Sequence, residues 1–170
     1  VISGHVGLMN TLPFRVRFLF QGDHGFRASA LRNRAALVAT EPFLAFLDGD
    51  HILSPYYLQD LASHIDSHCW MNGSRLRLNR WGARFLRLFG AVPPGFLLPL
   101  LMRKPREAQA WSTRGDAAAV VDDSLQAVFG GLSLIARDHF FAVNGFDERI
   151  EGWGGEDKIL TLRLRNLGVS

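Results

Sequence analysis

Short apolar runs and helical patterns alternate along the chain. Runs that are rich in β-forming residues and too short for helices predict strands at 16–20, 43–47, 69–73 and 132–136. Apolar residues at helical spacing, bounded by capping residues, proline or glycine, predict helices over 26–40, 54–67, 138–145 and 155–168. Strands that alternate with helices are typical of an α/β fold with parallel neighbours. We therefore expect a mixed, mostly parallel sheet flanked by helices.

The apolar run 43–47 ends in Asp48-Gly49-Asp50. In open α/β sheets, ligands bind beyond the carboxyl ends of strands. Carboxylate oxygens are the ligands that Mg²⁺ and Mn²⁺ prefer, and Gly49 lets the chain turn so that Asp48 and Asp50 face one ion. Such an ion would neutralise a diphosphate leaving group. The alternative is an ordinary turn, because Asp-Gly is a common turn dipeptide.

A second motif, Gly152-Trp153-Gly154-Gly155-Glu156-Asp157, opens the last predicted helix. The helix dipole alone favours acids in a first turn, but it does not explain the glycines and the tryptophan. Glycines allow a ligand to approach the backbone closely, and Trp153 can stack on the apolar face of a sugar ring. A carboxylate held there could take a proton from an acceptor hydroxyl.

Two single residues give weaker signals. Arg32 could meet a phosphate, and Asp23 could accept hydrogen bonds from a base or a ribose. The alternatives are a solvated helix face for Arg32 and an ordinary turn for Asp23.

Composition adds bounds to this picture. The chain has 170 residues, of which 48% are hydrophobic and 21% charged, which suits one globular domain. The net charge of +3 does not argue for nucleic acid. Cys69 is the only cysteine, so an internal disulfide is excluded and a reducing, cytoplasmic compartment is expected. The first residue is not Met, which suggests a fragment, and we find no signal peptide and no apolar run long enough to span a membrane.

Positive charge is concentrated between Arg75 and Arg106. This segment holds seven arginines and one lysine, no Asp or Glu, and the apolar run 96–102. It could lie on an anionic membrane surface, at the inner face of the cell membrane, or hold an anionic acceptor. The alternative is a packed helix with a solvated basic face.

The motifs, taken in order, resemble bacterial glycosyltransferases of family 2 with the GT-A fold. The resemblance runs roughly from Val16 to Gly168, and its second half looks like the galactosyltransferase C-terminal motif. The stretches that carry it are Gln21–Arg27, Arg32–Ala35, Phe46–Asp50, Gly130–Arg137, Asn144–Glu148 and Gly152–Asp157.

The resemblance implies an inverting transfer from a nucleotide-diphosphate sugar, usually UDP-linked, to a saccharide or lipid-linked acceptor in bacterial surface polysaccharide synthesis. It implies Mn²⁺ or Mg²⁺ on the DXD motif and a division into a donor and metal part (15–73), a basic apolar insert (74–128) and an acceptor and catalytic part (129–168). The family's opening strand is not matched before Val16, so we expect a GT-A-like sheet that lacks N-terminal strands. The implied roles are metal binding by Asp48 and Asp50, base catalysis by Asp157 assisted by Glu156, donor binding by Asp23, Arg27, Arg32 and Asp48, and acceptor binding by Trp153, Gly154 and Gly155.

Two other functions stay open on sequence alone. A truncated or decayed transferase would be a non-catalytic module that binds nucleotide sugar or carbohydrate. A metal-dependent phosphohydrolase could use Asp48 and Asp50, but it would leave the glycine and tryptophan motif without a purpose.

Overall fold

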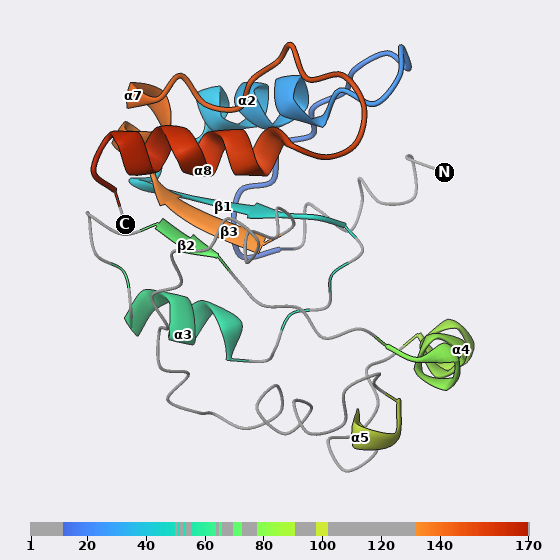
Figure 1. The fold of residues 1–170 in the computed structure, drawn as a ribbon. Helices are drawn as coiled ribbons and strands as arrows, with labels where there is room; N and C mark the ends of the chain where they lie inside the picture. Colours follow the sequence, from blue (N-terminus) through green and yellow to red (C-terminus); the bar gives the residue numbers. More distant parts are fainter. Residues whose placement is uncertain are drawn as a thin grey trace.

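A computed structural model describes residues 12–49, 51, 53, 56–63, 65, 70–72, 78–90, 98–101 and 132–169. Its helices and strands are drawn in Figure 1. In chain order they are α2 (Ala28–Val38), β1 (Phe43–Leu47), α3 (Tyr57–Ser63), β2 (Trp70–Asn72), α4 (Arg80–Phe89), α5 (Leu98–Leu101), β3 (Leu132–Ala136), α7 (Arg137–Ala142) and α8 (Glu156–Asn166). Strands β1 and β3 have the predicted bounds, and β2 lies inside its predicted range.

The described sheet has the order β1-β3-β2, and both pairings are antiparallel. Phe43 is opposite Ala136, and Trp70 is opposite Ile135. The predicted mostly parallel sheet is therefore not found among the described residues. Because β1 and β2 both run against β3, they run in the same direction, as a strand–helix–strand unit predicts. They are not neighbours, since β3 lies between them.

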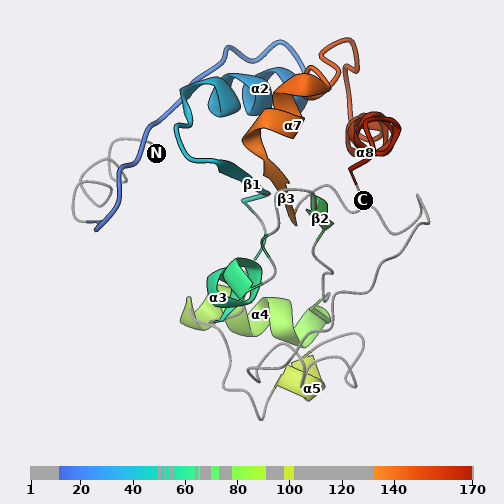
Figure 2. The ribbon, with the colours of Figure 1, turned by 90° about the vertical axis from the view of Figure 1, so that its left-hand side faces the viewer.

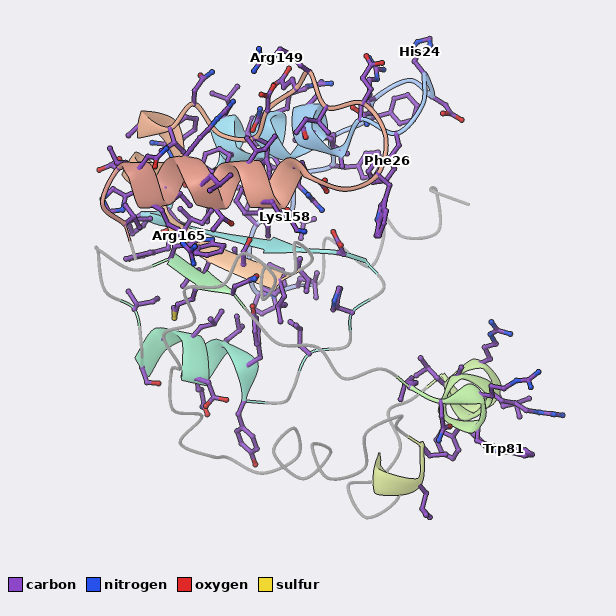
Figure 3. All side chains as sticks on the ribbon, in the orientation of Figure 1. His24, Phe26, Trp81, Arg149, Lys158 and Arg165 are labelled. Carbon is purple, nitrogen blue, oxygen red and sulfur yellow. The ribbon has the colours of Figure 1, made fainter. Side chains whose placement is uncertain are left out.

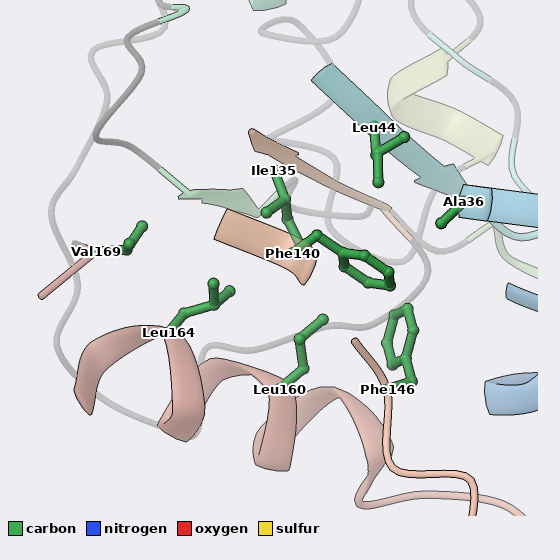
Figure 4. Packing of buried hydrophobic residues seen from close by; sticks show 8 residues of the cluster. All are labelled: Ala36, Leu44, Ile135, Phe140, Phe146, Leu160, Leu164 and Val169. Carbon is green, nitrogen blue, oxygen red and sulfur yellow. The ribbon is translucent and has the colours of Figure 1, made fainter. Parts of the chain in front are cut away.

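Three helices cover one face of this sheet. Figures 1 and 2 show α2, α7 and α8 on that face and α3 on the opposite side, with α4 and α5 on the α3 side and farther from the sheet. The core lies between the sheet and the helices α2, α7 and α8 (Figure 4). It consists of the buried residues Ala36, Leu44, Ile135, Phe140, Phe146, Leu160, Leu164 and Val169.

The strand predicted at 16–20 is wrong, because residues 15–23 have no regular secondary structure. Phe18 and Phe20 are exposed, so the β-forming residues of this segment bury no face against a partner strand. Side-chain hydrogen bonds connect this segment to the rest of the chain: Arg17 Nη1 donates to the carbonyl of Val38 at 3.0 Å, and Gln21 Nε2 donates to the carbonyl of Arg27 at 3.3 Å.

The helices are shorter than predicted. α2 and α8 each lose residues at both ends of their predicted ranges, and α7 ends where Asn144 and Gly145 take left-handed φ values of 61°. α3 covers 57–63, and residues 54, 55, 64, 66 and 67 of its predicted range lie outside the described residues. Among the helices that the structure describes, none combines the length and the apolar character needed to cross a bilayer.

Candidate functional site

Three carboxylates from distant parts of the chain meet at one guanidinium group. Arg32 Nη2 lies 2.8 Å from Asp48 Oδ1. Arg32 Nη1 lies 3.4 Å from both Glu156 Oε1 and Asp157 Oδ1. The Arg32 side chain is only 17% exposed, so the alternative of a solvated helix face is wrong. We call Arg32, Asp48, Glu156 and Asp157 the carboxylate cluster.

Strand and helix ends bring these acids together. Asp48 directly follows β1, and Glu156 and Asp157 form the first turn of α8. Gly155, with a left-handed φ of 98°, ends the loop before α8. The positive end of the helix dipole stabilises acids in this turn.

Phe146 and Asn33 hold Arg32 in place. The Arg32 guanidinium carbon lies 5.3 Å from the centroid of the Phe146 ring, a distance at which a cation and an aromatic face attract. Asn33 Nδ2 donates to the carbonyl of Phe146 at 2.9 Å, and the backbone N–H of Phe146 donates to Asn33 Oδ1 at 2.9 Å. A Cβ atom at Gly145 would lie 2.6 Å from Asn33 Oδ1, so the close contact requires glycine there. Asn33 and Phe146 lie in two of the stretches that carry the resemblance, Arg32–Ala35 and Asn144–Glu148, but their support of Arg32 was not predicted, because the two residues are distant along the chain.

A second ion-pair group ties the loop before α8 to that helix. Asp147 Oδ2 lies 2.7 Å from Arg149 Nη2 and 2.9 Å from Arg163 Nη2. Hydrogen bonds from the Arg149 side chain and backbone hold the pKa of Asp147 well below its usual range. Two arginines therefore neutralise the single carboxylate of Asp147. In the carboxylate cluster, by contrast, three carboxylates face one arginine, so the negative charge is in excess there.

One arginine cannot neutralise three carboxylates. Burial, as the largest cause, and the negative charge of Glu156 together raise the pKa of Asp157 to about 6, although Arg32 opposes the shift. Asp48 and a hydrogen bond with Glu156 add smaller upward contributions to the same pKa. Near neutral pH, Asp157 is therefore largely ionised yet basic enough to accept a proton.

This raised pKa makes the stability of the protein depend on pH. A carboxyl group whose folded pKa exceeds its unfolded pKa loses stability as the pH rises from about 4 through about 6. We expect Asp157→Asn to raise the free energy of unfolding at pH 8 by on the order of 2 kcal/mol and to have little effect at pH 4. Chemical denaturation in EDTA at the two pH values measures this difference. An equal effect at both pH values would contradict the assigned cause.

The predicted metal pair is described only in part. Asp48 lies in the carboxylate cluster, whereas Asp50 lies outside the described residues. Among the described side chains, no group of three His, Cys, Asp or Glu residues has the arrangement of a metal site. The donor chemistry fits a hard cation, because it consists of carboxylate oxygens. Glu156 Oε2 is buried and accepts no hydrogen bond from a described donor.

The loop before α8 carries the predicted acceptor residues. Gly152 N donates to the carbonyl of Phe26 at 3.0 Å, so this loop lies beside the segment that precedes α2 (Figure 3). Trp153 is 89% exposed. Gly154 and Gly155 have left-handed φ values of 95° and 98°, with open space where a Cβ atom would be. An exposed aromatic ring thus lies three residues before Glu156 in the chain, and Phe26 adds a half-exposed second ring.

Two of the four predicted donor residues, Asp23 and Arg27, lie outside the cluster, whereas Arg32 and Asp48 belong to it. Asp23 is exposed, on the same loop as His24, which Figure 3 shows pointing away from the sheet. Arg27 precedes α2, and its Nη2 donates to the carbonyl of Gly22 at 3.3 Å. None of the hydrogen bonds among the described residues joins Asp23 or Arg27 to the three carboxylates.

Comparison with known proteins points to sugar transfer. Residues 118–170 match the family described as the N-terminal domain of galactosyltransferase. This stretch contains β3, α7 and α8, and therefore Glu156 and Asp157.

Curated relatives agree with that match. Validoxylamine A glucosyltransferase of Streptomyces hygroscopicus subsp. jinggangensis is 30% identical over 175 residues, which cover 91% of this chain and 39% of that protein. Human beta-1,4-galactosyltransferase 4 is 53% identical over 36 residues, covering 21% of this chain and 10% of that protein. Mouse beta-1,4-galactosyltransferase 1 is 45% identical over 42 residues, covering 25% and 10%. The chain spans well under half the length of these relatives. The similarities support a glycosyltransferase, while family 2 and a bacterial origin stay predictions.

Proposed function

From this shared glycosyltransferase character, we propose that the chain forms the catalytic part of a metal-dependent, inverting glycosyltransferase. The transfer runs from a UDP-linked sugar to a saccharide or lipid-linked acceptor in bacterial surface polysaccharide synthesis. The convergence of Asp48 with Glu156 and Asp157 around Arg32 carries the proposal. The end of β1 and the start of α8, which carry the two candidate motifs, thus meet at one guanidinium group.

Asp157 is the proposed base. As the acceptor hydroxyl oxygen attacks the anomeric carbon, its proton passes to an Asp157 carboxylate oxygen, and the bond between the sugar and the diphosphate breaks. A pKa of about 6 lets this group be ionised before the step and take the proton during it. Glu156, buried beside it, orients the acceptor or the sugar.

Asp48 and Asp50 are the proposed ligands of Mn²⁺ or Mg²⁺. When bound, the ion would neutralise the charge that develops on the departing diphosphate. Arg32 is positioned to contribute positive charge on the same side, because its fork already reaches Asp48. Asp23 and Arg27 are proposed to contact the nucleotide.

Trp153, Gly154 and Gly155 are the proposed acceptor residues. The exposed Trp153 ring offers a face on which a sugar can stack, and the glycines leave room for the sugar to approach the backbone. An acceptor held there would lie at the start of α8, where Asp157 can take its proton.

Metal-dependent nucleotide binding tests the proposed metal pair. We expect the full chain to bind UDP at least about tenfold more tightly with Mn²⁺ than with EDTA, since tenfold corresponds to only about 1.4 kcal/mol. Asp48→Ala is expected to abolish that difference in titration calorimetry. Asp138→Ala, which removes an exposed acid from α7, is the matched control and should bind like the unmodified protein. Equal affinity of the unmodified protein in both conditions would refute the metal assignment.

A further inference from the structure

Helix α4 presents an outward surface that combines arginines with large apolar side chains. Arg80, Arg84 and Arg87 are spaced at i, i+4 and i+7, so they lie along one stripe of the helix. Trp81 and Leu88 are also seven residues apart and form a parallel stripe. Each of these two side chains is 69% exposed. We call these five residues, Arg80, Trp81, Arg84, Arg87 and Leu88, the α4 surface.

Contacts on the opposite side of α4 decide which side faces outward. Gly82 is the buried residue of the helix, and a Cβ atom there would clash with the carbonyl oxygen of Leu101. Asn79 caps the helix by accepting hydrogen bonds from Trp81 N and Gly82 N, and its Nδ2 donates to the carbonyl of Leu100 at 2.7 Å. With the Gly82 side held against α5, the arginine stripe points away from it. Figure 3 shows Trp81 on the side of α4 that faces away from the sheet.

The charge of this surface is not neutralised within the described residues. No Asp or Glu occurs between Arg75 and Arg106. None of the ion pairs among the described residues involves Arg80, Arg84 or Arg87. The surface therefore offers uncompensated positive charge directly beside exposed apolar groups.

We propose that the α4 surface binds an anionic lipid surface. A lipid interface meets both halves of this pattern, since its headgroups attract arginines while its acyl boundary takes up tryptophan and leucine. A nucleic acid backbone would meet the arginines but leave the apolar stripe of Trp81 and Leu88 unpaired. A contiguous exposed apolar group of this kind marks an interaction site rather than ordinary surface.

The geometry of α4 fits a helix that lies along the interface. Its 10 residues extend about 15 Å at 1.5 Å per residue, about half the hydrocarbon thickness of a bilayer. The arginine stem is long enough to keep its charge in the headgroup region while its methylenes lie against apolar neighbours. This proposal uses none of the carboxylate cluster, so it stands or falls separately from the proposed function.

Vesicle flotation of the full chain tests the proposal. We expect flotation with vesicles of 70% phosphatidylcholine and 30% phosphatidylglycerol, and much weaker flotation with phosphatidylcholine alone. The combined variant Arg80→Gln, Arg84→Gln, Arg87→Gln should lower the partition coefficient roughly a hundredfold, at about fivefold per arginine. The corresponding triple lysine variant keeps the charge and should still float.

A control variant separates a local surface from the overall charge. Arg15→Gln, Arg17→Gln and Arg34→Gln together remove the same charge from exposed residues elsewhere and should float like the unmodified chain. Brominated lipid should quench the tryptophan fluorescence of the unmodified chain more strongly than that of Trp81→Phe. Failure of the unmodified chain to float with either lipid composition would overturn the proposal. An equal loss of flotation in the two triple glutamine variants would overturn it as well. Equal quenching in Trp81→Phe would overturn the insertion of the apolar stripe.

Discussion

Replacing Asp157 by asparagine is expected to lower the turnover number by about a thousandfold, within the range that a positioned general base contributes. Asparagine keeps the size of the side chain and an oxygen that can accept from Arg32 Nη1, but it cannot take a proton at neutral pH. The dissociation constant for UDP should change by less than about threefold, because the lost group acts on the acceptor hydroxyl. Release of UDP from UDP-glucose and UDP-galactose, with a panel of saccharide acceptors, measures the turnover.

The pH profile provides a second readout of the same residue. With a pKa of about 6 for Asp157, kcat/KM of the unmodified enzyme should fall about tenfold per pH unit below that value. The residual activity of Asp157→Asn should lack this fall. Glu151→Gln, which changes an exposed acid in the same loop, is the matched control. Unchanged turnover in Asp157→Asn would remove Asp157 from the role of base, even if the chain still transfers sugar.

The second large effect is expected on stability. Arg32→Met removes the guanidinium that three carboxylates share and keeps a side chain of similar length. Asp48 is 44% exposed, but Glu156 and Asp157 are only 7% and 22% exposed. Removing the cation that faces such buried carboxylates leaves uncompensated charge and costs roughly 3 kcal/mol. We expect a loss of about that size at pH 8, read from denaturant unfolding in EDTA.

The sign of the pH dependence distinguishes charge from packing. Arg32 lowers the pKa of Asp157, so its removal raises that pKa further. At pH 5 Asp157 is then protonated and less charge needs a partner, and the loss should shrink to about 1 kcal/mol. Arg34→Met removes an exposed arginine from the same helix and should change stability by less than about 0.5 kcal/mol. A loss of unfolding free energy in Arg32→Met that does not vary with pH would show that packing against Phe146, rather than charge, accounts for the contribution of Arg32 to stability.

Local patterns in the sequence predicted the elements that form the site. The apolar run 43–47 and the strand 132–136 appear with their predicted bounds, and Glu156 opens α8. Each of these signals depends on neighbouring residues only: a short apolar run, or acids after a glycine at a helix start.

What the sequence did not show depends on contacts between distant residues. For Arg32 the sequence left open both a phosphate contact and a solvated helix face, because nothing near it in the chain reveals that Asp48, Glu156 and Asp157 surround it. Its support by Phe146 is equally distant along the chain. The strand order was missed for the same reason. The pattern of strands and helices gives the direction of β1 and β2, but not the insertion of β3 between them.

That insertion has a consequence for how the chain folds. Each described pairing needs β3, and its register joins Phe43 to Ala136. The entropy of closing so long a loop must be offset before the sheet gains any hydrogen bond, so a high contact order and slow folding are expected. During synthesis, β1 has to wait for its described partner until Leu132–Ala136 has left the ribosome. An edge strand of the described sheet that is exposed for that long is a segment on which a chaperone would act.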